Sequence, residues 1–149
     1  MLLHYLCIDM GRLLAIDYGK KRTGIAVTDC LQIVATALDT VPTHNLLQFL
    51  VDYVAREKVD KFIIGEPKQL NGEPSESTRY IRPFLDKLKK QFPDIPVVMF
   101  DERFTSAIAH RALIDAGASK STRKEKSIID RMAATIILND YLQSIQHKK

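Results

Sequence analysis

Two apolar runs of strand length lie close together near the start of the chain and are joined by a short, positively charged turn. The first run ends at the carboxylate Asp17, Gly19 follows it, and three successive cations at positions 20–22 lead into the second run. A parallel connection needs a dozen or more residues, so these runs are predicted to pair as an antiparallel hairpin. A chain that opens with a hairpin does not form a simple doubly wound fold, in which strands and helices alternate from the start.

An acid at the end of a buried strand, beside a basic turn, suits a metal ion and an anionic backbone. The same residue types also build ordinary turns, so Asp17 can equally be a turn former with the cations on a solvated hairpin tip. Both interpretations stay open on this stretch alone.

The remaining apolar patterns predict the order βββ-α-β-α-β-α-α. Thr43 is a candidate N-cap for the first helix, which is expected to end near residue 58. The fold class is therefore predicted to be α/β, with one mixed five-stranded sheet whose first three strands are antiparallel, two further parallel strands, and helices on both faces. Strands are expected at 12–18, 23–29, 33–40, 61–65 and 96–100, and later helices at 78–91, 107–116 and 126–144.

Composition limits the function classes. The 149 residues predict a single domain at 10–149, with residues 1–9 as a disordered extension or the result of an upstream start. A net charge of +4 is compatible with a nucleic-acid partner without establishing one. No apolar run approaches the roughly 20 residues of a membrane span, and the first nine residues lack the basic start of a signal peptide. The two cysteines form no CxxC motif, so we expect a cytoplasmic protein with reduced thiols.

Carboxylates end each strand that is predicted to be parallel. Asp17, Glu66 and the pair Asp101-Glu102 follow the first, fourth and fifth strands, whose carboxyl ends should meet at one edge of the sheet. Asp130 shares the core-facing side of the last helix with positions 133, 134, 137 and 141. Oxygen ligands without His or Cys favour Mg²⁺ or Mn²⁺, and two such ions about 4 Å apart would suit phosphodiester hydrolysis. Taken singly, each acid has a simpler explanation as a cap, a loop acid or a turn residue.

Four segments together resemble one known family. The strings AIDYGKKRTGIAVTD, IIGEPKQLNG, DERFTS and KSIIDRMAATIIL are similar to the YqgF/RuvX family, from about Met10 to Leu142. The resemblance implies a ribonuclease-H-like fold and relatedness to Holliday-junction resolvases. It also implies that Asp17, Glu102 and Asp130 are the catalytic and metal-binding carboxylates. Strand alternation allows only one acid of the DER segment to face the site, and Glu102 is preferred with Asp101 as the alternate. The expected phosphate contacts are Lys20, Lys21, Arg22, Arg103 and Lys126.

The resemblance further implies a metal-dependent endonuclease that trims the 5′ end of pre-16S ribosomal RNA. Branched-DNA cleavage and a catalytically silent RNA-binding assembly factor are the alternatives. The implied partners are nucleic acid and ribosomal precursor particles, with the chain as a monomer or weak dimer and no membrane partner. Glu66 stands where the family more often has an apolar residue, so it is either an extra ligand or, preferably, an acceptor of hydrogen bonds from the following loop.

Overall fold

The computed structural model describes residues 10–66, 77–101 and 123–146, and in the last range it describes side chains from Met132 onward. The strands are β1 (Arg12–Asp17), β2 (Arg22–Thr28), β3 (Ala35–Pro42), β4 (Val59–Glu66) and β5 (Val97–Asp101). A short 3₁₀ turn, η1 (Thr43–Asn45), leads into α2 (Leu46–Arg56), and the later helices are α3 (Ser77–Gln91) and α5 (Arg123–Gln146). The helix predicted at 107–116 and the extension predicted at 1–9 lie outside the described residues.

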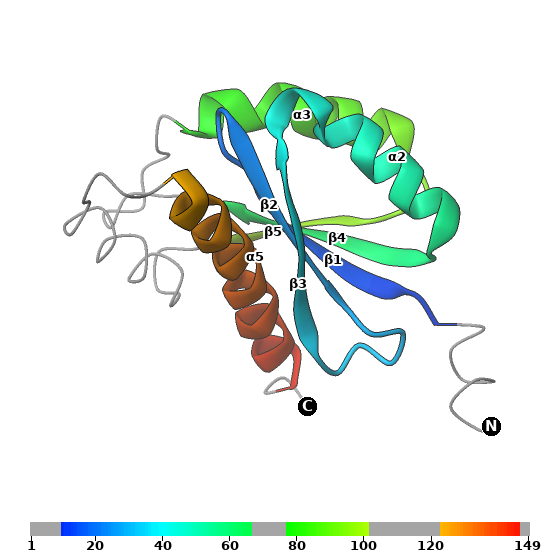
Figure 1. Ribbon diagram of the computed structural model, residues 1–149. Helices are drawn as coiled ribbons and strands as arrows, with labels where there is room; N and C mark the ends of the chain where they lie inside the picture. The colour runs from blue at the N-terminus through cyan, green and yellow to red at the C-terminus, as the bar shows by residue number, and fades with distance from the viewer. Residues whose placement is uncertain (1–9, 67–76, 102–122, 147–149) are drawn as a thin grey trace.

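The strands form one mixed sheet in the order β3-β2-β1-β4-β5. β2 pairs antiparallel with both β1 and β3, whereas β4 runs parallel to β1 and β5 parallel to β4. The predicted α/β class, the opening antiparallel strands and the two added parallel strands are therefore confirmed. The carboxyl ends of β1, β4 and β5 meet at one edge, which Figure 1 shows next to the first turns of α5.

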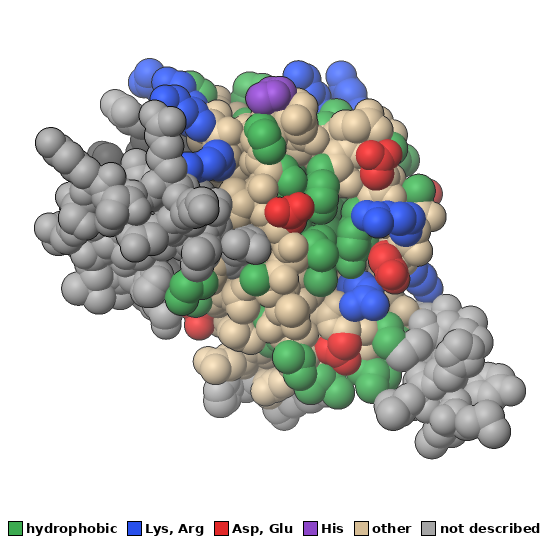
Figure 2. All heavy atoms as spheres, in the orientation of Figure 1, with side chains coloured by type: hydrophobic (Ala, Val, Ile, Leu, Met, Phe, Trp, Pro, Cys, Tyr) green, Lys and Arg blue, Asp and Glu red, His purple; other side chains and the backbone are tan. Residues whose placement is uncertain are grey.

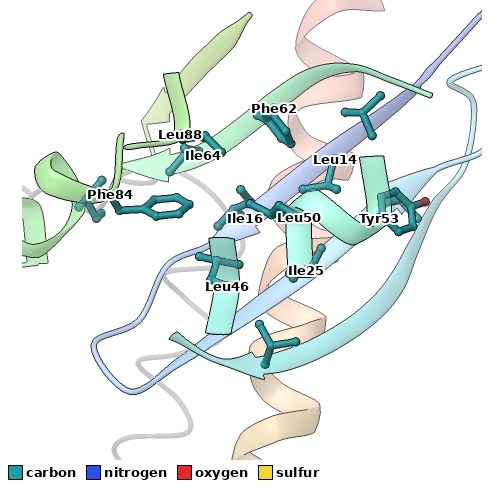
Figure 3. Close-up of a cluster of buried hydrophobic side chains, with 14 residues drawn as sticks. Leu14, Ile16, Ile25, Leu46, Leu50, Tyr53, Phe62, Ile64, Phe84 and Leu88 are labelled. Atoms are coloured by element: carbon teal, nitrogen blue, oxygen red, sulfur yellow. The ribbon is translucent and has the colours of Figure 1, made fainter. Parts of the chain in front are cut away.

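Helices cover both faces of the sheet, as predicted. On one face Leu14 and Ile16 of β1 pack with Phe62 of β4 beneath α2 and α3 (Figure 3). On the other face Leu13 and Ala15 pack against α5. Because both sides of β1 are buried, its sequence is apolar at successive positions instead of alternating with polar residues.

α5 lies close to the sheet through small side chains. Ala133 and Ala134 are fully buried, and Ile137 and Tyr141 continue the same side of the helix. These are the positions that the sequence predicted to face the core. None of the helices in the described ranges is long and apolar enough to cross a membrane.

Two sequence-based expectations are wrong. Thr43 does not cap a helix, because the N-cap of η1 is Pro42 and that of α2 is Asn45, each without a side-chain capping bond. Cys30 is disulfide-bonded, so the prediction of reduced thiols fails for this residue. The other cysteine of the sequence, Cys7, lies outside the described residues. The sequence around Cys30 gives no local signal for a disulfide, because such a bond depends on tertiary structure.

Candidate active site at the sheet edge

Asp17 ends the central strand β1 as a buried carboxylate. Its side chain is 7% exposed, and it stands opposite Gly24 of β2. Side chains alternate along a strand, so Asp17 lies on the same face as Leu13 and Ala15, the face that α5 covers. A ligand at this carboxylate would therefore lie between the sheet edge and the start of α5 (Figure 1).

The basic turn, residues 19–21 with Arg22, follows Asp17 directly. Lys20 and Lys21 are exposed, and Arg22 is half-buried at the first position of β2. A Cβ placed on Gly19 would lie 2.2 Å from the carbonyl oxygen of Arg22, so only glycine fits this tight turn. Figure 2 shows Lys and Arg side chains gathered along the upper left of the molecule, where the β1–β2 turn and the start of α3 lie in Figure 1.

Thr43 positions the basic turn from the end of β3. Its Oγ1 donates a hydrogen bond to the carbonyl oxygen of Gly19 at 2.6 Å and lies 3.0 Å from Oγ1 of Thr23. Its backbone N–H donates to the carbonyl oxygen of Lys21 at 2.9 Å. This role was not predicted from the sequence, because a threonine just before a helical pattern is also a typical N-cap residue.

Glu66 and Asp101 are register partners at the ends of β4 and β5. Phe62 and Ile64 of β4, and Met99 of β5, pack on the α2–α3 side, so alternation places both acids on that side as well. They therefore lie on the face opposite to Asp17. This placement argues against Glu66 as an extra ligand and against Asp101 as the partner of Asp17, and Glu102 stays a prediction.

The other predicted site residues fall outside what the structure describes. Glu102 and Arg103 lie outside the described residues. Asp130 and Lys126 stand on the backbone of α5, and their side chains are outside the described part. The structure therefore brings Asp17 together with the basic turn and leaves the remaining convergence as a prediction.

The donor chemistry of Asp17 fits a hard divalent cation. A carboxylate oxygen is a ligand that Mg²⁺ and Mn²⁺ prefer, and the place, at the carboxyl ends of parallel strands, is one where α/β folds bind ligands. Among the described side chains no three His, Cys, Asp or Glu residues gather closely enough to hold a metal. Two of the three predicted ligands have side chains outside that set.

Comparison with known proteins identifies the class. A model of the RuvX family, described as Holliday junction resolvase, matches residues 11–144. The chain belongs to this family.

Several proteins of known sequence are similar to this chain over nearly their whole length. A protein of Phocaeicola vulgatus named "Putative pre-16S rRNA nuclease" is 56% identical over 135 residues, covering 91% of this chain and 97% of that protein. Proteins with the same name from Flavobacterium johnsoniae and Parabacteroides distasonis are 55% and 48% identical, and cover 91% and 93% of this chain. Among solved structures, Archaeoglobus fulgidus Pelota matches with a TM-score of 0.45 and 12% identity, over 93% of this chain and 38% of that one. That likeness is too weak to bear on function.

Proposed function

We propose that this protein is a nuclease that hydrolyses phosphodiester bonds at the 5′ end of pre-16S ribosomal RNA. The observation that carries the proposal is the buried carboxylate of Asp17 next to an exposed basic turn, at the edge where three parallel strands end. Family membership and the name shared by the relatives support the same reaction class. An acid that binds a cation beside residues that bind phosphate is an arrangement suited to metal-assisted phosphodiester cleavage.

Asp17, Glu102 and Asp130 are proposed to hold Mg²⁺ or Mn²⁺, with two ions as the expected number. A bound divalent ion supplies Lewis-acid polarisation of the phosphate and an activated water. Lys20, Lys21 and Arg22 of the basic turn are proposed to contact phosphate oxygens and fix the position of the strand. Arg103 and Lys126 are proposed to extend that contact.

The decisive variant is Asp17→Asn, which removes the charge and keeps the shape of the side chain. End-labelled pre-16S RNA 5′ fragments, unrelated RNA and branched DNA would each be incubated with parent and variant in Mg²⁺, in Mn²⁺ and in chelator. We expect metal-dependent cutting by the parent and a loss of at least about 100-fold in the variant, since a metal ligand is removed. Mn²⁺ binding followed by isothermal titration calorimetry should weaken in parallel.

Asp39→Asn is the matched control, because it makes the same chemical change on an exposed position of β3. It should cut and bind Mn²⁺ as the parent does. Full activity in Asp17→Asn, with circular dichroism showing both variants folded, would remove Asp17 from the mechanism.

Branched-DNA cleavage is the second candidate, because the matched family model is described as Holliday junction resolvase. The substrate panel distinguishes ribosomal RNA from branched DNA. If the parent cuts four-way junctions preferentially, branched DNA is the substrate in place of ribosomal RNA. Salt-sensitive binding without cutting under either metal would instead identify a binding factor built on the same fold.

A further inference from the structure

A cleft of about 410 Å³ opens behind the basic turn, on the α2–α3 side of the sheet. Its volume lies within the range of protein sites for small organic ligands. Three stretches far apart in sequence form its walls: the end of β1 with the basic turn, η1 with the start of α2, and α3. The lining residues are Tyr18, Lys20, Thr43, His44, Leu47, Tyr80, Pro83, Phe84 and Lys87.

The cleft combines positive charge with an exposed aromatic ring. The ammonium of Lys20 lies 5.0 Å from the centroid of the Tyr80 ring, close enough for a cation–π contact that favours one placement of this side chain. Tyr80 is 46% exposed, so a ligand can reach its ring. Lys87 and His44 are exposed, and within the described ranges neither has an ion-pair partner. The lining contains no carboxylate.

The floor of the cleft is aromatic and packs on the core. Tyr18 stacks on Phe84 with ring centroids 5.1 Å apart, and both rings belong to the core beneath α3. An aromatic floor with cations at the rim suits a ligand that has a flat ring and a negative charge.

The cleft and Asp17 lie at the same edge of the sheet but on opposite faces. Asp17 lies on the α5 side, whereas the next residue, Tyr18, packs with the core on the α2–α3 side. The basic turn connects them. A nucleic-acid strand that places a phosphate at Asp17 and crosses the turn would bring its neighbouring nucleotide to the cleft.

We propose that this cleft binds one unpaired nucleotide of the substrate strand, next to the phosphodiester held at Asp17. The base packs against the Tyr80 ring, and Lys20 and Lys87 contact the flanking phosphates. A paired base cannot enter, because its faces are already stacked within the duplex. The inference rests on the proposed function and narrows the substrate to nucleic acid with a single-stranded segment beside the cleavage site.

Equilibrium binding in chelator tests the cleft without cleavage. Fluorescence anisotropy would measure short labelled single strands of RNA and of DNA, and duplexes of the same length, against parent, Tyr80→Leu and Tyr80→Phe. Loss of one stacked base predicts about 5- to 150-fold weaker single-strand binding for Tyr80→Leu. Tyr80→Phe keeps the ring and should bind as the parent does. The affinity of Tyr80→Leu for duplexes should change by less than about twofold. If this variant loses affinity for single strands of both RNA and DNA, the contacted group is the base, which both share.

Two lysines of α3 test the contribution of positive charge to binding. Lys87→Gln removes a cleft cation and should lower the salt dependence of binding by about one phosphate contact. Lys89→Gln makes the same change on the same helix outside the cleft and should leave that dependence unchanged. Photocrosslinking of a strand that carries a halogenated pyrimidine should label the peptide containing Tyr80.

The results also separate this inference from the nuclease proposal. If Tyr80→Leu and Lys87→Gln are folded and bind single strands as the parent does, the proposed nucleotide site is wrong. This holds even if cutting depends on Asp17. Equal losses with duplex and single strand would overturn it too. The two variants could lose single-strand binding selectively although the parent cuts nothing under either metal. That result would support the nucleotide site in the cleft and reject the proposed nuclease activity. Since Lys87 is exposed, its variants carry the test if Tyr80→Leu fails to fold.

Discussion

Replacing Thr43 by Val should loosen the basic turn while keeping the shape of the side chain. The hydroxyl of Thr43 joins the turn to the end of β3 through Gly19, and it also contacts Thr23, which is fully buried. Valine cannot make either contact. The backbone bond from position 43 to Lys21 remains, so the turn should stay attached but less well defined.

The expected cost follows from those two contacts. A neutral hydrogen bond contributes about 0.5–1.5 kcal/mol net, and a buried polar group left without a partner costs about 1–3 kcal/mol. The carbonyl of Gly19 is near the surface and can find water, whereas the hydroxyl of Thr23 is shielded. We therefore expect a loss of about 2 kcal/mol in the free energy of unfolding. For a chain of this size that corresponds to a Tm lower by about 4–8 °C.

Differential scanning calorimetry and denaturant titration would measure the loss. Thr43→Ser keeps the hydroxyl and should recover most of the stability. Thr36→Val makes the same change at an exposed position of β3 and should alter Tm little. Single-strand binding in chelator should weaken for Thr43→Val, because Lys20 and Lys21 lose a fixed placement. A valine variant as stable as the parent, or a serine variant as unstable as valine, would refute the role assigned to this hydroxyl.

Two further changes test the turns at the two ends of β2. Gly19→Ala places a Cβ 2.2 Å from the carbonyl oxygen of Arg22, so the backbone must shift; we expect a loss of about 1–3 kcal/mol by thermal melting, and an unchanged Tm would show that the turn is adaptable. For Asp29, burial raises the pKa, but hydrogen bonds from the backbone N–H groups of Val34, Ile33 and Leu31 lower it below 3.8 overall. A carboxylate whose pKa is lower in the folded state than in the unfolded state stabilises the protein at any pH above its unfolded-state pKa. That stabilisation is lost as the pH falls through the folded-state pKa. The Tm difference between the parent and Asp29→Asn should therefore be present at neutral pH and shrink below about pH 4; a difference independent of pH would contradict this.

The sheet could be predicted because its determinants are local. Each strand is a short apolar run bounded by turn residues, and the few residues between the first three strands allow only antiparallel pairing. The core-facing side of α5 was also readable, since helical spacing from Asp130 reaches Ala133, Ala134 and Ile137, all now found buried. In these elements the period of the apolar pattern and the tertiary structure agree.

Contacts between distant segments could not be predicted. The role of Thr43 depends on the β1–β2 turn lying beside the end of β3, which follows from the strand register and not from residue type. The cleft combines Lys20, His44, Tyr80 and Lys87, and none of these residues is unusual in its own segment. Which face Glu66 and Asp101 occupy likewise became clear only from the core residues that precede them.

The adjacent residues Asp17 and Tyr18 show how one sheet edge can carry two kinds of chemistry. Side chains alternate along the strand, so the carboxylate faces α5 and the aromatic ring faces α3. The proposed metal-binding and nucleotide-binding surfaces therefore lie on opposite faces of the sheet. The basic turn links the two, and its placement governs both. The placement of the turn depends on Gly19, which admits no side chain, and on the hydroxyl of the half-buried Thr43. By this reasoning Gly19 and Thr43 are positioning residues, and their substitution should weaken single-strand binding and cleavage together. Asp17→Asn should instead lower cleavage and Mn²⁺ binding and leave single-strand binding in chelator unchanged.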